Sequence, residues 1–223
     1  MNSKLKSVLF LLIVTLASVS CSDNKLYETS YCALVDTSGT YADEKKNVVK
    51  IVKAGVVPEM VPGDSLFFVK IDSNSYAEDN LVTKLTLDYR PSKANSQKLA
   101  LANTLDEFAE GKARSNQTDI SGALMLCSDY LKSTKAGTQI MFVFSDMKEE
   151  LPKGVVRKFE SNEFDGINIA AMNVIKLNRD SSNPEVYRSR LKQWDKELIG
   201  SGAKSWNNLI DASKIQEFIL AAK

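Results

Sequence analysis

The sequence contains no histidine among its 223 residues. This absence excludes Ser-His-Asp and Cys-His catalysis, histidine-based zinc sites and imidazole pH switches. A charge excess is also missing, since 29 Lys and Arg against 28 Asp and Glu give +1, so nucleic acid is not an expected partner. What remains is chemistry by hydroxyls, carboxylates, lysine or backbone groups. With 43% hydrophobic and 26% charged residues, the chain is expected to fold as one domain with a short appendage.

The first twenty residues have the pattern of a secretory signal. Lys4 and Lys6 precede an apolar stretch at 8–17, and the small residues Ser18 and Ser20 follow it. The stretch is shorter than the roughly 20 residues that span a bilayer as a helix. Removal of this segment takes away two lysines and leaves 27 basic against 28 acidic residues, a net charge of −1.

Cys21 directly follows these small residues, and the pattern resembles a bacterial lipoprotein signal, in which the cysteine becomes the acylated N-terminus. Ser18 departs from it, because leucine usually stands at that place. The alternative is ordinary cleavage after Ser20, which leaves Cys21 as a free thiol. We expect a signal peptide at 1–20, a lipidated cysteine and tether at 21–30, and a folded domain at 31–223. Enteric lipoproteins that are retained at the inner membrane have Asp directly after the cysteine. This chain has Ser22 at that place, which favours the outer membrane over the inner one. A chain without the lipid would be periplasmic.

The rest of the sequence alternates strand and helix patterns. Apolar or alternating runs predict strands at 31–35, 65–71, 81–87, 139–144, 167–175 and 204–207, the third a half-exposed edge strand. Helical spacing predicts helices at 41–57, 96–109, 120–131, 151–164, 184–199 and 213–222. This alternation predicts an α/β fold with a doubly wound, mostly parallel open sheet flanked by helices.

Oxygen-bearing side chains follow two of these strands and precede one helix. Asp36, Ser38 and Thr40 follow the first strand, Thr118 stands where a helix begins, and Asp146 follows the most apolar strand. Ligands of doubly wound sheets bind beyond the carboxyl ends of the strands, where these residues are expected. Taken singly, each group also suits a loop or a helix cap.

Together the motifs DTSGT, TDISGAL and FVFSD resemble the von Willebrand factor type A (VWA) domain and its metal-ion-dependent adhesion site (MIDAS). The family pattern is D-x-S-x-S, a distant Thr and a distant Asp, and Thr40 replaces the second Ser while keeping its hydroxyl. The resemblance implies that Ser38 and Thr40 bind a metal directly, Thr118 directly or through water, and Asp36 and Asp146 mostly through water.

Hydroxyls and carboxylates suit Mg²⁺, or Mn²⁺ or Ca²⁺ in its place. Because the direct ligands are largely neutral, the ion stays electron-poor, and a carboxylate from a protein partner completes its shell. The expected function is therefore an exported, lipid-anchored binding module for a protein partner, and not an enzyme.

Two alternatives stay open. DTSGT also resembles the D-x-x-G-T motif of haloacid dehalogenase-like phosphatases, which would make Asp36 a nucleophile; on this reading the other roles fall to Ser73, Lys135, Asp146 and Glu150. That family usually has an acid where Ser38 stands. The second alternative is a VWA scaffold whose metal site is vestigial.

Two further cysteines lie at comparable depths in the expected fold. Cys32 precedes Asp36 by about 13 Å at strand rise, and Cys127 follows Thr118 by about 13.5 Å at helix rise. If Asp36 and Thr118 meet at one metal, an exported chain permits a disulfide between these cysteines. Two buried thiols are the equal alternative.

Overall fold

A computed structural model describes residues 25–112, 115–172 and 184–223, except the side chains of residues 25, 26 and 40. The strands are β1 (Lys25–Asp36), β2 (Ser65–Ile71), β3 (Leu81–Thr86), β4 (Ala136–Phe144), β5 (Ile167–Met172) and β6 (Ser205–Leu209). The α-helices are α2 (Lys45–Gly55), α3 (Pro91–Glu110), α4 (Ile120–Thr134), α6 (Pro184–Gly200) and α7 (Lys214–Ala222). Short 3-10 turns form η2 (Gly39–Glu44), η3 (Val57–Glu59) and η4 (Glu78–Asn80).

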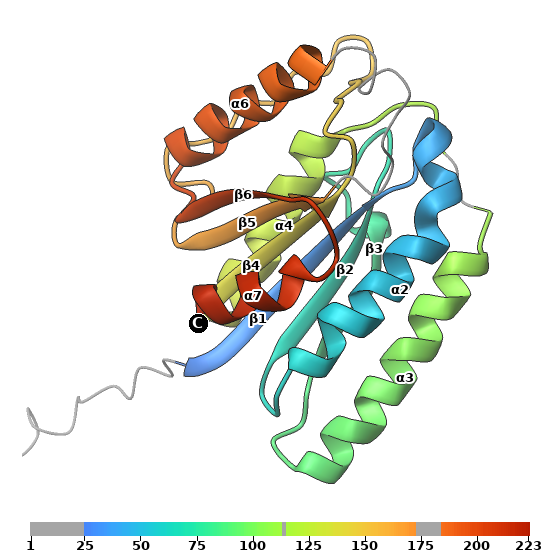
Figure 1. Cartoon of the computed structure of the whole chain (residues 1–223), viewed down its shortest axis with the longest axis vertical. Coiled ribbons are helices and arrows are strands. Elements are labelled where there is room, and N and C mark those ends of the chain that lie inside the picture. The colour runs from blue at the N-terminus through green and yellow to red at the C-terminus, as the bar shows by residue number, and fades with distance from the viewer. Residues whose placement is uncertain (1–24, 113–114, 173–183) are drawn as a thin grey trace, which may run out of the picture.

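The six strands form one sheet in the order β3-β2-β1-β4-β5-β6 (Figure 1). The edge strand β3 runs antiparallel to β2, and the other neighbours are parallel. The predicted doubly wound α/β fold is therefore confirmed, including the half-exposed edge strand. The carboxyl ends of the five parallel strands share one edge, which becomes the site described below.

The central strand β1 is longer than the sequence indicates. It begins at Lys25, and Thr29 and Ser30 already pair with β4 and β2. Residues 25–30, predicted to be part of the tether, therefore belong to β1, and the predicted start of this strand at residue 31 is wrong. The hydrophobic pattern does not predict this part of the strand, because Thr29 and Ser30 are polar residues. Both are nevertheless buried.

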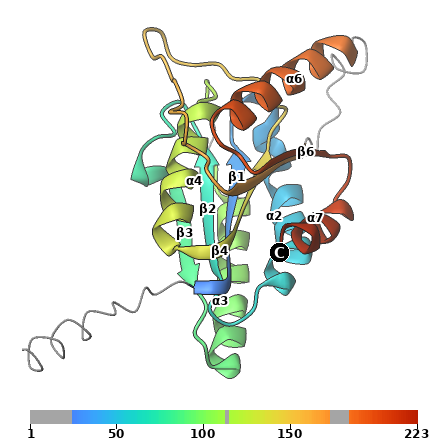
Figure 2. The same ribbon diagram turned by 90° about the vertical axis from the view of Figure 1, so that its left-hand side faces the viewer.

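The two faces of the sheet carry separate hydrophobic cores because side chains alternate along each strand. On one face Tyr31, Ala33 and Val35 pack with α2, α3 and α7. On the other face Cys32 and Leu34 pack with α4, Trp194 and Leu198 of α6, and Phe164. Figure 2 views the sheet nearly edge-on, with α4 on one side and α2 and α7 on the other.

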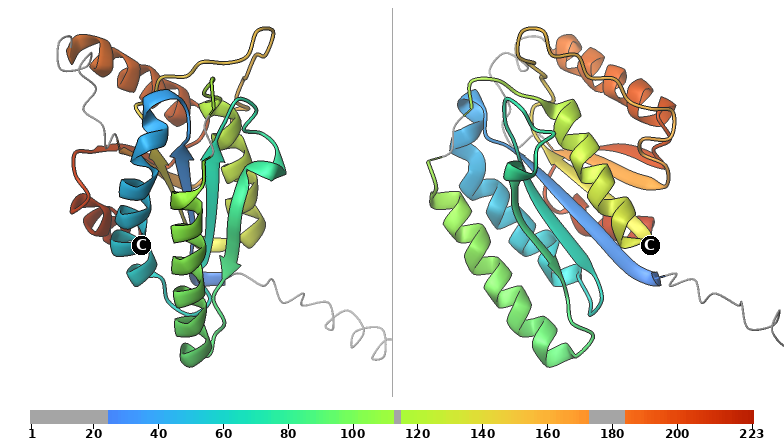
Figure 3. Two further views of the ribbon diagram at one scale, coloured as in Figure 1. Left: turned by 90° about the vertical axis from the view of Figure 1, so that its right-hand side faces the viewer. Right: turned by 180° about the vertical axis from the view of Figure 1, so that it is seen from behind.

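The predicted helix at 151–164 is wrong. The described segment between β4 and β5 has no α-helix and only isolated bridges and turns. Pro152 and Gly154 form a turn in which Val155 N–H donates to the Pro152 carbonyl at 3.0 Å, and Gly154 has φ +87°. Such a turn interrupts a helix near its start. Figure 3 shows the segment rising past α4 and running alongside α6.

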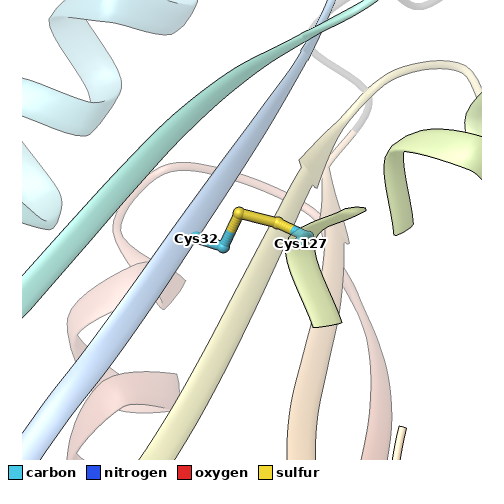
Figure 4. The surroundings of a disulfide bond; sticks show 2 residues. All are labelled: Cys32 and Cys127. Atoms are coloured by element: carbon cyan, nitrogen blue, oxygen red, sulfur yellow. A yellow bond between two sulfur atoms is a disulfide. The ribbon is translucent and has the colours of Figure 1, made fainter. Parts of the chain in front are cut away.

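Cys32 of β1 and Cys127 of α4 form a disulfide across the second core, with Cα atoms 6.1 Å apart (Figure 4). Both residues are fully buried. The bond ties the central strand to the helix that begins next to Thr118. Among the helices of the described residues, none has the length and apolar character needed to cross a membrane.

Candidate metal centre

A small pocket lies at the carboxyl edge of the sheet, beside the ends of the neighbouring strands β1 and β4. It has a volume of about 220 Å³ and is lined by Asp36, Ser38, Gly39, Tyr41, Asn116, Thr118, Asp146, Lys148 and Glu150. The chain leaves β1 toward η2 and α2 on one face, whereas it leaves β4 toward a segment whose Met147 and Phe164 pack on the other face. This divergence is the topological switch point at which open α/β sheets bind ligands.

Three of the predicted site residues are joined by a chain of hydrogen bonds. Thr118 Oγ1 donates to Ser38 Oγ at 2.7 Å, and Ser38 Oγ donates to Asp36 Oδ1 at 2.5 Å. Ser38 N–H donates to the same carboxylate oxygen at 2.8 Å. The structure thus brings together a Thr and a Ser that are 80 residues apart in sequence.

Asp36 is the most buried of these groups, with 2% of its surface exposed. Its second oxygen accepts a hydrogen bond from Ser145 Oγ at 2.7 Å. Burial raises the pKa of Asp36 to about 6, against the lowering effect of the hydrogen bonds from Ser38 and Ser145. The negative charge of Asp146 adds to this raised pKa. A divalent cation here would favour the ionised form of Asp36.

Asp146 occupies a more accessible wall of the pocket, with a side chain 15% exposed. Its Oδ1 accepts from Lys148 N–H at 2.8 Å, which holds the carboxylate in a local turn. Arg190 of α6 donates to the Asp146 backbone carbonyl at 2.7 Å and places its guanidinium 3.9 Å from Oδ2. Asp146 is therefore fixed from two sides, by its own loop and by α6.

The donors of this pocket fit a hard cation. Two ligands at right angles on Mg²⁺ lie about 3.0 Å apart at the usual 2.1 Å bond length. Ser38 Oγ and Thr118 Oγ1 are separated by 2.7 Å, so a small adjustment suffices. The part of the chain that the structure describes has no cluster of three or more carboxylate, thiol or imidazole groups placed to hold a metal. A metal here would therefore depend on hydroxyls and water as well as Asp36 and Asp146. The side chain of the fifth predicted ligand, Thr40, lies outside the described part.

The residues of the phosphatase alternative do not all meet. Lys135 precedes β4 at the amino end of the strand, about 30 Å along the strand from Phe144. Asp36 lies at the other edge, beside Phe144, because Val35 pairs with it. Ser73 does not line the pocket and shares a hydrogen bond with Ser115 at 2.8 Å. The arrangement leaves Asp36 without the lysine that this reading assigned to it.

Three supporting residues, Ser145, Met147 and Trp194, are not predicted by the sequence patterns. Ser145 is fully buried and accepts Met147 N–H at 3.0 Å while its hydroxyl donates to Asp36. Met147 has a left-handed backbone with φ 61°, which is uncommon for a residue other than glycine. Trp194 of α6 holds this conformation, because its indole N–H donates to the Met147 carbonyl at 2.9 Å. Strained backbone of this kind often accompanies a functional site. Only the place of Ser145 at a strand end signals its role in sequence.

A buried ion pair fixes the start of α4, directly after Thr118. Asp119 is fully buried, caps the helix by accepting Gly122 N–H at 2.8 Å, and accepts two hydrogen bonds from Arg157, at 2.6 and 3.2 Å. Asp119 raises the pKa of the Arg157 guanidinium further. Glu149 also accepts Ser121 N–H at 2.7 Å, and burial raises the pKa of this carboxyl. Acidic groups thus satisfy the free amides of the first turn.

Searches of protein-family models and of curated proteins find no match to this sequence. Solved structures do resemble the fold. A von Willebrand factor type A protein from Catenulispora acidiphila aligns over 88% of this chain with a TM-score of 0.53 and 10% identity. A mutant of the PilB minor pilin from Streptococcus sanguinis aligns over 90% with a TM-score of 0.50 and 10% identity. Proximal thread matrix protein 1 from the mussel byssus aligns over 100% with a TM-score of 0.51 and 15% identity.

This chain spans 42%, 61% and 52% of those three structures, in the same order. At such low identities the likeness shows the fold alone. The fold of this chain is VWA-like.

Proposed function

We propose that this chain is a binding module that holds Mg²⁺, or Mn²⁺ or Ca²⁺, in the pocket at the carboxyl edge and binds a protein partner there. One observation carries the proposal: the hydroxyls of Ser38 and Thr118 meet in a pocket that is also lined by a buried carboxylate, Asp36, and a more accessible one, Asp146. The proposed metal-site residues are Asp36, Ser38, Thr40, Thr118 and Asp146. The VWA-like fold supports the proposal, because four of the residues that resemble the MIDAS motif line one pocket in it.

The residues around the pocket would have different roles at such a site. Asp36 orients Ser38 by accepting both its hydroxyl and its amide hydrogen. The oxygen of Ser38 therefore keeps its acceptor capacity, part of which is used by the hydroxyl of Thr118. Ser145 holds the second oxygen of Asp36 and thereby restricts that carboxylate. Ser38, Thr118, Asp36 and Asp146 would hold the metal, directly or through water, and the metal would supply a positive charge able to attract a partner's carboxylate.

Metal titration tests the first half of the proposal. A ligand that binds only the folded protein raises the melting temperature. We expect Mg²⁺ to raise it and EDTA to reverse the gain, and Asp146→Ala to abolish the response while the fold is retained. Asp195→Ala, which removes an exposed carboxylate of α6, is the matched control. No response to Mg²⁺, Mn²⁺ or Ca²⁺ in the wild type would favour the vestigial-site alternative.

Partner binding tests the second half. Proteins captured by the wild type in Mg²⁺ but lost in EDTA and with Asp146→Ala would support metal-dependent binding. Capture that survives both treatments contradicts it. Turnover of an aryl phosphate in Mg²⁺ that disappears with Asp36→Asn would instead favour the phosphatase alternative.

We also propose that the module is held at the bacterial cell envelope by a lipid on Cys21. The support is the sequence pattern before this cysteine. Incorporation of labelled fatty acid into the wild type, and its loss with Cys21→Ser, tests the anchor independently of the metal.

A further inference from the structure

A second, larger cavity lies between α4 and α6 and has a volume of about 670 Å³. It lies beside the smaller pocket lined by Asp36, Ser38, Thr118 and Asp146, which is called the metal pocket below. One face of α6 forms a wall of it, and the first turn of α4 and the irregular segment after β4 form the others. Its lining residues are Ser121, Met147, Lys148, Glu149, Arg157, Lys158, Phe159, Arg190, Gln193, Trp194, Glu197 and Ser201. Lys148 lines both pockets, so the two spaces are neighbours.

The segment between β4 and β5 lines the cavity without forming an α-helix. The segment that replaces the predicted helix is nevertheless held in place. Arg157 binds the buried Asp119, Met147 accepts the Trp194 indole N–H, and Ser128 of α4 donates to the Glu163 carbonyl. In each of these contacts the partner is a buried residue of a flanking helix or its cap: Asp119 and Ser128 for α4, and Trp194 for α6. The walls are therefore preformed, as in most ligand-binding cavities.

The two neighbouring pockets have opposite charge. The lining of the α4–α6 cavity has four cationic residues and two acidic ones, Glu149 and Glu197, a balance of +2. The lining of the metal pocket has three acidic residues and one cation, Lys148, a balance of −2. Three of the four cavity cations already have carboxylate neighbours outside its lining: Lys148 pairs with Glu150, Arg157 with Asp119, and Arg190 lies 3.9 Å from Asp146. The metal pocket thus suits a cation, whereas an anionic group in the cavity would depend on the fourth cation, Lys158.

Lys158 is the cation best placed to meet such a group. It is exposed, and no ion pair joins it to another residue of the described ranges. Arg157, by contrast, is committed to Asp119. Phe159 and Trp194 give the same cavity an apolar surface. An acidic side chain next to an apolar one matches this lining, and the volume accommodates a short peptide segment.

We propose that the α4–α6 cavity binds an acidic peptide segment of the protein partner, with a carboxylate at Lys158 and an apolar side chain against Phe159 and Trp194. The inference rests on the proposed function, because the same segment would place another carboxylate at the metal pocket. Lys148 marks the place where the segment passes from one pocket to the other. The partner is therefore recognised by two acidic residues and not by one.

Fluorescence of Trp194 tests the cavity directly. The full chain has two tryptophans, so Trp206→Phe leaves Trp194 as the only indole. The probes are synthetic peptides with a Leu-containing spacer of varied length between two Glu residues, and matched peptides with Gln in place of one or both. In Mg²⁺ we expect the two-Glu peptides to change Trp194 emission and to bind more tightly than the one-Glu peptides.

Charge reversal at the rim supplies the matched pair of variants. Lys158→Glu should weaken binding of the two-Glu peptide about tenfold, because it places a like charge against the carboxylate. Lys153→Glu makes the same change in the same exposed segment but outside the cavity lining, and should leave affinity unaltered. Melting curves of both variants verify that each is folded.

The outcomes separate this proposal from the metal-site proposal. If EDTA abolishes peptide binding but Trp194 stays silent and Lys158→Glu behaves as Lys153→Glu does, the cavity proposal is overturned and the metal site stands. If Trp194 responds and Lys158→Glu weakens binding while EDTA and Asp146→Ala change nothing, the cavity stands and the metal-dependent function fails. Absence of any Trp194 response to every peptide overturns the cavity proposal.

Discussion

The two pockets at the carboxyl edge share Lys148 but are built in different ways. The metal pocket is small, acidic and made of residues at strand ends, with Asp36, Ser38 and Thr118 in one hydrogen-bonded chain. The α4–α6 cavity is larger, cationic and partly aromatic, and an irregular segment and one face of α6 enclose it. In this chain, residues next to strand ends form the small polar site, whereas the larger cavity depends on how α6 and the segment between β4 and β5 pack against α4.

The largest expected effect comes from breaking the ion pair that both pockets depend on. Arg157→Leu leaves the Asp119 carboxylate buried without its cation, and we expect a loss of about 3–5 kcal/mol in the free energy of unfolding. Urea denaturation measures it. Lys158→Leu, the adjacent control, should change stability by about 0.5 kcal/mol or less. Equal losses in the two variants would show that the ion pair does not hold the start of α4.

Removal of the disulfide tests how strongly α4 is held to the sheet. This helix borders the larger cavity and begins two residues after Thr118 of the metal pocket. The bond closes a sequence separation of 95 residues, and Cys32→Ala with Cys127→Ala should cost about 2–4 kcal/mol. A reductant should lower the melting temperature of the wild type but not that of the double variant. A wild type that is insensitive to reductant after unfolding and refolding would contradict this expectation.

The pH dependence should distinguish the two pockets, because only the metal pocket contains Asp36. With a pKa of about 6 for Asp36, roughly one tenth of this group is ionised at pH 5, so Mg²⁺ should bind about tenfold more weakly there than at pH 7. Calorimetric titration at the two pH values measures the ratio. Peptides confined to the cavity should not show this dependence on Asp36.

The same shift has a consequence for the metal-free protein. Because the pKa of Asp36 is higher in the folded protein than its ordinary value of 3.8, the folded state holds this proton more tightly than the unfolded chain. The stabilisation is fully present below about pH 4 and is lost as the pH rises through 6. Asp36→Asn should flatten that part of the profile, and an unchanged slope would argue against Asp36 as its source.

The smallest expected effect concerns the residue that the pockets share. Lys148 forms an exposed ion pair with Glu150, so Lys148→Gln should change stability by less than about 1 kcal/mol. Loss of this positive charge should strengthen Mg²⁺ binding about two- to threefold at low salt, and added salt should reduce the gain. Lys153→Gln is the control. Weaker Mg²⁺ binding by Lys148→Gln would contradict the charge contrast between the pockets.

The metal pocket was largely foreseeable from sequence because its residues follow the strands directly. Asp36 ends β1 and Asp146 lies two residues beyond β4, so parallel pairing brings them to one edge. Thr118 joins them through α4, whose start the Asp119 cap indicates. Their role as metal ligands stays a prediction, and so does the lipid anchor on Cys21. Ser145 was missed because nothing in sequence says which side of the strand end its hydroxyl faces.

The cavity was not foreseeable, because the periodicity at 151–164 indicates a helix that the chain does not form. Arg157 lies in that segment, which is not helical, and its side chain binds Asp119, 38 residues away in the sequence. The turn at Pro152 and Gly154 can be predicted from the local sequence, but the contact between Arg157 and Asp119 cannot. A long-range contact thus overrides a local helical preference.

By itself the sequence determined the alternation of strands and helices, the absence of imidazole chemistry and the gathering of oxygen donors at strand ends. Each of these depends on local hydrophobic periodicity or on composition, which act through near neighbours. The folded structure shows in addition that β1 starts at Lys25, that Cys32 and Cys127 are bonded, and that an irregular segment lining a cavity stands where a helix was predicted. Those outcomes depend on pairing register, helix rotation and a buried ion pair between distant segments, which are set only when the whole chain packs.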